Sequence, residues 1–314
     1  MSSYLVLSGG LSPERDVSLR SGRRVAEALR LSTDDEVREA DVDLSLIDLL
    51  RKHRPSCVIP LLHGAAGEDG ALRDVLTSLD LPYVGSTGES ARLAFDKPIA
   101  KTLLARAGVA TPAYVALPHA SFRELGAAEV LSGIRDLLGL PLIVKPTKGG
   151  SALGASLVKS AEDFPSAMVG AFAYSEVAMM EQWIAGTEVA ISVLETGDST
   201  SALPAVEIVP KAEMYDYNSR YTAGTTEFFV PARLSDDIAA ECARIALLAH
   251  EVLGLRDWSR TDLIVDSSGT PWFLETNAAP GMTETSLFPQ SLHAAGLSLG
   301  DTALRLVQRA IARK

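Results

Sequence analysis

Residues 142–154 read LIVKPTKGGSALG and are the most informative part of the sequence. The apolar residues before Lys145 predict a buried strand that ends on this lysine, and the glycines that follow leave backbone N–H groups free to face outward. A cation at a strand end beside such a loop suits a polyphosphate. It is not a Walker P-loop, because the lysine precedes the glycines and no helix opens directly after them. Taken alone, the stretch is also compatible with a flexible hairpin.

A second polar cluster lies near the C-terminus, where Asp262 falls in one predicted strand and Glu275 and Asn277 fall in the next. Glu275 and Asn277 share a face because side chains alternate along a strand. Two carboxylates and an amide oxygen suit Mg²⁺ or Mn²⁺ that holds nucleotide phosphates. Solvated carboxylates on an edge hairpin are the alternative, but the flanking residues are apolar. The glycine turn at residues 280–283 could present a backbone N–H as an oxyanion donor.

The periodicity predicts an α/β unit followed by an α+β region. Strands at residues 4–7 and 57–62 with a helix at 17–29 between them predict a doubly wound parallel sheet that is covered on both faces. Asp96 and Pro98 predict a helix from residue 96 to about 107. Strand runs dominate after residue 113, which is typical of antiparallel sheets. Long helices are predicted at about 236–253 and 299–313.

Composition limits the class of function. The chain has 314 residues and a net charge of -11 without a basic block, which argues against nucleic acid and anionic membranes as partners. The start, MSSYLVLSGG, lacks the features of a signal peptide, and no apolar run reaches spanning length, so we expect a cytoplasmic protein. The only cysteines, Cys57 and Cys242, lie in apolar surroundings and argue against a disulfide framework.

Eight segments, in order and over nearly the whole chain, resemble the motifs of the D-alanine–D-alanine ligase family. The family patterns are GGxSxE(R)xVS, HGxxGEDG, DK, KPxxxGSSxG, ExW(I/L)xGxE, YDYxxKY, RxD and ENTSPGMTxxSLxP. Their counterparts here are residues 9–18, 63–70, 96–97, 145–154, 181–188, 215–221, 260–262 and 275–289.

The resemblance implies an ATP-grasp fold in three parts, with an N-terminal α/β substrate domain at 1–95, a central subdomain at 96–183 and a C-terminal subdomain at 184–314. It implies ligation of two D-alanine molecules to D-alanyl-D-alanine through an acyl phosphate, for peptidoglycan and hence cell wall synthesis. ATP and two Mg²⁺ or Mn²⁺ ions are the implied cofactors. A homodimer formed through the first domain is the implied assembly.

The resemblance also implies a role for each matching residue. Phosphates would be held by Lys97 and Lys145, adenine by Glu181 and the Ile184 backbone, ribose by Glu188, and metal ions by Asp262, Glu275 and Asn277. The first D-alanine would be bound by Glu14, linked through Ser151 to Tyr221, with His63 and Arg220 nearby. Developing oxyanion charge would be stabilised by Arg260 and the Gly281 N–H, and the second substrate's carboxylate by Ser286 and the Leu287 N–H. Residues 215–224 would form a mobile lid.

Four departures from the family patterns affect the pocket. Arg220 replaces a lysine, Ala152 a serine and Gln182 a lysine, and Ala278-Ala279 replace Thr-Ser. Arginine keeps the charge of lysine but has fork geometry. Two alternatives therefore stay open: a ligase for another small amino or hydroxy acid, and a catalytically silent nucleotide-binding homologue. A dinucleotide dehydrogenase is excluded, because Ser8-Gly9-Gly10 lacks the Gly-x-Gly-x-x-Gly spacing.

Overall fold

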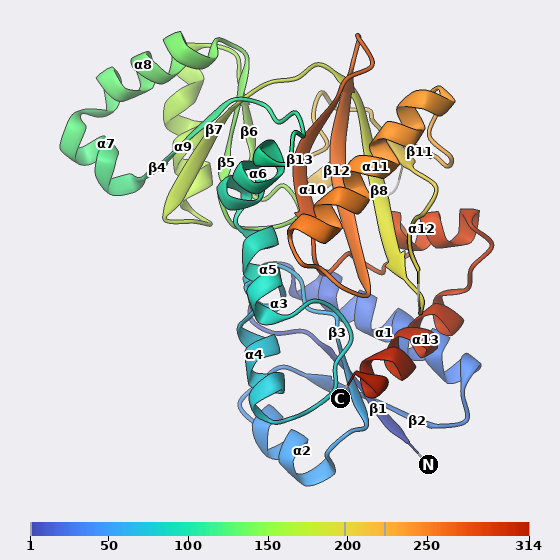
Figure 1. The fold of residues 1–314 in the computed structure, drawn as a ribbon. Helices are drawn as coiled ribbons and strands as arrows, with labels where there is room; N and C mark the ends of the chain where they lie inside the picture. Colours follow the sequence, from blue (N-terminus) through green and yellow to red (C-terminus); the bar gives the residue numbers. More distant parts are fainter. Residues whose placement is uncertain (1, 198, 223, 314) are drawn as a thin grey trace.

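A computed structural model of the chain describes residues 2–197, 199–222 and 224–313, and its strands form three separate sheets (Figure 1). The first sheet lies at the end of the molecule that holds both termini, and the other two lie side by side at the opposite end. Among the described residues, every helix is too short or too polar to cross a bilayer.

The first sheet is parallel, in the order β2-β1-β3. Its strands are β1 (Ser3–Ser8), β2 (Glu36–Asp41) and β3 (Cys57–Pro60). Because side chains alternate along a strand, Tyr4 and Val6 of β1 join one apolar core, whereas Leu5 and Leu7 join another. The predicted parallel sheet covered on both faces is confirmed.

Helices from both ends of the chain cover the Tyr4 face of this sheet. They are α1 (Arg15–Ser32) and α13 (Leu299–Ala312), which pack against each other. Leu306 and Val307 of α13 are fully buried in the core that contains Val6. The opposite face is covered by α2 (Leu46–His53) and α4 (Ala71–Ser78). The short helices α3 (Ala65–Glu68) and α5 (Gly88–Phe95) flank α4.

The second sheet is antiparallel, in the order β4-β7-β5-β6. Its strands are β4 (Tyr114–Pro118), β5 (Leu142–Pro146), β6 (Ser156–Val158) and β7 (Val177–Gln182). Leu142 and Val144 of β5 face a core shared with the helices, so Ile143 and Lys145 point to the other face. The helices are α7 (His119–Leu125), α8 (Ala127–Leu138) and α9 (Phe164–Phe172), and a 3₁₀ turn (Ala161–Asp163) precedes α9.

The third sheet is also antiparallel, in the order β11-β10-β8-β12-β13, with β9 paired to β8. Its strands are β8 (Gly186–Glu195), β9 (Thr200–Ala202), β10 (Val206–Pro210), β11 (Thr226–Phe229), β12 (Trp258–Asp266) and β13 (Pro271–Asn277). Helix α11 (Asp236–Val252) packs on one face, where Val189 and Leu263 are buried. The short helices α10 (Tyr217–Tyr221) and α12 (Leu287–Ala294) complete this part.

Helix α6 (Lys97–Arg106) begins where the sequence predicted. The Asp96 side chain accepts a hydrogen bond from the Ile99 N–H at 3.3 Å, and Pro98 lies in the first turn. Ala100 and Leu104 pack into the core of the third sheet. The N-terminus of α6, with Lys97, is thereby held beside that sheet, although the predicted boundary at residue 96 assigns it to the central subdomain. The three residue ranges predicted for the domains stay a prediction.

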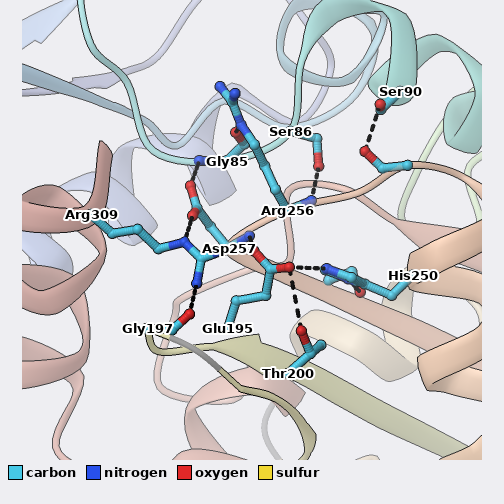
Figure 2. A network of polar contacts seen from close by, with 12 residues as sticks. Gly85, Ser86, Ser90, Glu195, Gly197, Thr200, His250, Arg256, Asp257 and Arg309 are labelled. Carbon is cyan, nitrogen blue, oxygen red and sulfur yellow. Dashed lines mark hydrogen bonds and ion pairs between the residues drawn. The ribbon is translucent and has the colours of Figure 1, made fainter. Parts of the chain in front are cut away.

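A polar network joins the first and third sheets (Figure 2). Asp257, directly before β12, is fully buried and accepts a hydrogen bond from the Gly85 N–H at 2.6 Å. Arg309 of α13 donates to Glu195 at 2.8 Å, and His250 lies 3.6 Å from the same carboxylate. Trp258 also packs in the core that contains Tyr4 and Val6. Together these contacts fix the first sheet to one end of β8 and β12.

Candidate active site

The strand pair β12 and β13 brings the predicted metal ligands together. In the register of this pair, Asp262 lies opposite Glu275 and Arg260 lies opposite Asn277. Directly opposed residues of an antiparallel pair share a face, so all four side chains share one. The register shifts between Asp262 and Leu263, and the extra residue on β13 is Leu274. This bulge lets Leu274 and Glu275 both line the same cavity.

The charges of this face are paired. Arg260 donates to Asp262 through Nε and Nη2, each at 2.7 Å, and both side chains are buried. Lys97 Nζ lies 3.1 Å from Glu275 Oε2 and donates to the Gly149 carbonyl at 2.7 Å. Burial alone raises the pKa of Glu275, but the nearby cations, Lys97 first, lower it to about 2. Glu275 is therefore an anion near neutral pH.

A cavity of about 460 Å³ lies between the second and third sheets. Its polar lining includes Lys97, Lys145, Glu181, Glu188, Asp262 and Glu275. Its apolar lining includes Ile143, Leu153, Trp183, Ile184, Ile208, Met214, Ile264 and Leu274. Apolar walls with a few convergent charges are typical of a cofactor site. Every residue that the sequence predicted to hold nucleotide or phosphate lies here.

A smaller cavity of about 50 Å³ adjoins the first. Ser151 donates to Glu14, and the hydroxyl oxygens of Ser151 and Tyr221 are 2.7 Å apart. Gly281, Ser286, Leu287, His63 and Arg260 also line it. Gly150, Tyr215 and Arg220 line both cavities. The two cavities therefore form parts of one cleft, and Arg220 lies where they meet.

Comparison with known proteins decides the family. The family model described as "D-ala D-ala ligase C-terminus" matches residues 103–308. The chain belongs to the D-alanine–D-alanine ligase family. A D-alanine–D-alanine ligase of Anaeromyxobacter dehalogenans is 40% identical over 97% of this chain and 96% of its own length. One of Pelotomaculum thermopropionicum is 37% identical over 98% of this chain and 96% of its own length.

Solved structures of the D-alanine–D-alanine ligase family share the fold. The enzyme of Bacillus anthracis superposes with a TM-score of 0.82 at 28% identity and covers 99% of this chain and 98% of its own. The same enzyme complexed with ATP gives a TM-score of 0.81 at 27% identity, over 99% and 97%. The predicted ATP-grasp fold, with an α/β domain first, is confirmed.

Two buried charged residues, one beside a D-alanine–D-alanine ligase motif and one within another, were missed by the sequence reasoning. Lys101 Nζ contacts Glu181 and donates to Thr111 at 2.7 Å and to the Phe273 carbonyl at 3.1 Å. Burial lowers the pKa of Lys101 to about 8, and Glu181 opposes this shift. The four-residue spacing from Lys97 placed Lys101 on the same helix face, which was the available signal.

Glu68 is the other missed residue. It accepts from the Gly64 N–H at 2.9 Å, and burial raises the pKa of its carboxyl to about 8, helped by the charge of Glu14. With its amide oxygen turned toward Arg260 at 2.7 Å, Asn277 donates to Glu68 at 2.7 Å. A polar chain thus runs from Glu68 through Asn277 and Arg260 to Asp262. The motif HGxxGEDG contained the signal, but Glu68 was not singled out from it.

Glu181 is paired with two lysines, which a contact with adenine alone would not require. One carboxylate oxygen contacts Lys101, and the other accepts from Lys145 at 2.6 Å. Burial alone raises the pKa of Glu181, but the two lysines outweigh it and lower it. Glu181 lines the larger cavity between Lys145 and the segment 182–184. Its contact with adenine stays a prediction.

The predicted lid lies over the junction of the two cavities. Helix α10 begins after Asp216, whose side chain accepts from the Ser219 N–H at 2.8 Å. The Arg220 guanidinium lies 4.2 Å from the centre of the Tyr215 ring, a cation–π contact. Residue 223 lies outside the described residues. That the segment moves during turnover stays a prediction.

Proposed function

We propose that this chain joins two molecules of D-alanine to D-alanyl-D-alanine and converts ATP to ADP and phosphate. The observation that carries the proposal is the shared cleft. Lysines and acidic groups line one cavity, the linked Glu14, Ser151 and Tyr221 line the next, and Arg220 borders both. The name of the curated relatives and the ATP complex of a structural relative support the same reaction.

In the first step, a carboxylate oxygen of the first D-alanine attacks the γ-phosphorus of ATP, and ADP leaves. Lys97 and Lys145 neutralise phosphate charge, and Arg220 lies where the transferred group passes between the cavities. Glu14 accepts a hydrogen bond from the substrate ammonium and fixes its orientation. The activated carboxyl is then a mixed anhydride with phosphate as its leaving group.

In the second step, the free amine of the second D-alanine attacks the carbonyl carbon of the acyl phosphate. The tetrahedral oxyanion is stabilised by Arg260 and by the Gly281 N–H, which face the smaller cavity. Collapse breaks the carbon–oxygen bond to phosphate, the departing phosphate takes up the proton that the amine loses, and the peptide bond remains. Ser286 and the Leu287 N–H hold the second carboxylate.

The donor set also suits divalent cations. Asp262, Glu275 and the Asn277 amide offer hard oxygen atoms on one face of β12 and β13. Two Mg²⁺ or Mn²⁺ ions bound there would neutralise the triphosphate. Release of Asp262 from Arg260 would free its oxygens for this role. We further propose that the protein is a cytoplasmic homodimer that supplies peptidoglycan synthesis.

The test is a phosphate-release assay with ATP, Mg²⁺ and a panel of D- and L-amino and D-hydroxy acids, with products identified by mass spectrometry. D-alanine should give D-alanyl-D-alanine and one phosphate per dipeptide. Turnover of a different acid only would indicate a ligase of another specificity. ATP binding with no turnover of any acid would indicate a silent nucleotide-binding protein.

A further inference from the structure

We propose that Ser21 and Arg24 of helix α1 are positioning residues that aim the Gly281 N–H at the reacting carbonyl, with His63 as the link between them and the turn. The inference rests on the proposed function. It assigns the N-terminal helix a part in the second chemical step, besides the substrate-binding role of Glu14, which directly precedes the helix.

Ser21 connects α1 to both His63 and the turn that follows Asn277. Its side chain is fully buried, and its oxygen accepts a hydrogen bond from the Met282 N–H at 3.1 Å. The same oxygen lies 2.9 Å from His63 Nε2. A hydroxyl has one proton to donate. The Ser21 oxygen can also accept from the ring, so the direction of this contact follows from the other hydrogen bond of His63, which is to the backbone of Ala279.

His63 is therefore held as one neutral tautomer. The bond to the Ala279 backbone raises the pKa of His63, so a ring N–H donates to the Ala279 carbonyl. The neutral ring has one N–H, which is then on Nδ1 and leaves Nε2 to accept from the Ser21 hydroxyl. Burial lowers the pKa of His63 to about 4, which keeps the ring neutral near pH 7. The ring links α1 to the peptide unit between Ala279 and Pro280.

Arg24 holds the other side of the turn. Its Nη1 donates to the Met282 carbonyl at 3.0 Å and also to the Thr283 carbonyl. Thr283 in turn donates its N–H to Ser286 Oγ at 2.9 Å. One helix thus fixes the carbonyls of Met282 and Thr283 as well as the Met282 N–H.

The Pro280–Gly281 peptide unit lies between two peptide units that are hydrogen-bonded. On one side the Ala279 carbonyl accepts from His63, and on the other the Met282 N–H donates to Ser21. Within the described ranges the Gly281 N–H has no acceptor, and the residue lines the smaller cavity. A Cβ at position 281 would lie 2.8 Å from Ser286 Oγ. The N–H is therefore free while its direction is constrained, which is what a preorganised oxyanion donor requires.

The consequence is specific to the amide-forming step. If the turn loosens, phosphoryl transfer to the first carboxylate continues, but attack by the amine slows. Water can then attack the phosphorus atom of the waiting acyl phosphate and break the phosphorus–oxygen bond, which returns D-alanine and releases phosphate without forming an oxyanion at the carbonyl. The ratio of phosphate to dipeptide therefore reports on the aim of the Gly281 N–H, and a general loss of folded protein does not change it.

The experiment compares Ser21→Ala, Arg24→Gln and Arg24→Lys with the unmodified chain and with Arg23→Gln, an exposed arginine on the same helix. Phosphate and dipeptide are measured together under saturating D-alanine, and thermal unfolding of each variant is recorded. We expect a ratio near one for the unmodified chain and Arg23→Gln. Ser21→Ala and Arg24→Gln should raise the ratio and lower the dipeptide rate at least about ten-fold, with the KM for ATP unchanged. Arg24→Lys should recover part of the loss.

Folded Ser21→Ala and Arg24→Gln variants with normal rate and ratio would overturn the proposal, as would a lower rate at an unchanged ratio. If Ser21→Ala does not fold, the two Arg24 variants decide the matter. Failure of the unmodified chain to make dipeptide would instead overturn the proposed function.

Discussion

Arg260 and Asp262, two residues apart on β12, form a forked ion pair with two contacts of 2.7 Å. The two residues belong to different steps of the proposed reaction, since Asp262 would bind metal and Arg260 would stabilise the oxyanion. The pair keeps both charges satisfied in a buried site while no substrate is present. Metal ions that bind Asp262 would then compete with Arg260 for its oxygens.

Replacement of Asp262 should change the metal requirement. We expect Asp262→Asn to lower kcat at least about a hundred-fold and to raise the Mg²⁺ concentration at half-maximal rate. Activity measured across a Mg²⁺ titration checks this. Asp266→Asn, at the end of the same strand, should behave like the unmodified chain. An unchanged Mg²⁺ dependence of Asp262→Asn would remove Asp262 from the metal site.

Lys101 should strengthen ATP binding although it is not among the residues that line the larger cavity. It neutralises Glu181, which leaves the charge of Lys145 available for phosphate. In Lys101→Met, Lys145 becomes the only cation paired with Glu181, so we expect the KM for ATP to rise about ten-fold, or about 1.4 kcal/mol of lost binding. The KM for D-alanine should change little. The exposed Lys52→Met is the control, and an equal KM for ATP in both variants would refute the charge-balance role.

Tyr221 should affect the first substrate and leave the nucleotide unaffected. Tyr221→Phe removes the hydroxyl that lies 2.7 Å from Ser151, which contacts Glu14. We expect a higher KM for D-alanine, by about five- to ten-fold for one lost hydrogen bond, at an unchanged KM for ATP. Tyr217→Phe is a matched control, since Tyr217 lies next to Tyr221 and is partly exposed. Equal D-alanine kinetics in the two variants would contradict the predicted linkage.

The polar network that joins the first and third sheets should make the stability of the protein depend on pH in the acid range. Burial alone raises the pKa of Glu195, but His250, the Asp257 N–H and Arg309 lower it to about 2 from the ordinary 4.5. Between these values the unfolded chain binds more protons, so this contribution to stability is present above pH 4.5 and is lost as the pH falls toward 2. Glu195→Gln should therefore lower the unfolding free energy at pH 7 and flatten its decrease in this window.

Chemical unfolding at pH values from 3 to 7 measures the effect, with Glu241→Gln as the control. Glu241 is an exposed carboxylate paired with Arg244 in the same helix. If the two variants show parallel pH curves, the network does not supply the predicted stabilisation.

Much of the fold and the grouping of the candidate site could be predicted because they depend on periodicity. Alternation along a strand predicted that Glu275 and Asn277 share a face, and a parallel first sheet followed from apolar strands separated by a helix. Strand β2, with the sequence EVREAD, was missed because an edge strand with one buried residue lacks an apolar run. The short apolar run at residues 81–84 forms only an isolated bridge, between Val58 and Tyr83.

The parts that could not be predicted depend on tertiary neighbours. Apart from its four-residue spacing from Lys97, nothing local marks Lys101 as buried, because its contacts come from Glu181 and Phe273, which are distant in sequence. The bulge at Leu274 follows from the pairing of β13 with β12. The hydrogen bonds that Ser21 accepts from Met282 and that Arg24 donates to Met282 and Thr283 span most of the chain. Such contacts become visible only when the chain is folded.

The packing of α13 against α1 has a consequence for biosynthesis. The core that contains Val6 also contains Leu306 and Val307, so the first sheet lacks part of its cover until these residues leave the ribosome. Until then the apolar side of α1 stays exposed to solvent or to chaperones. The unit that is translated first is therefore among the last to complete its folding.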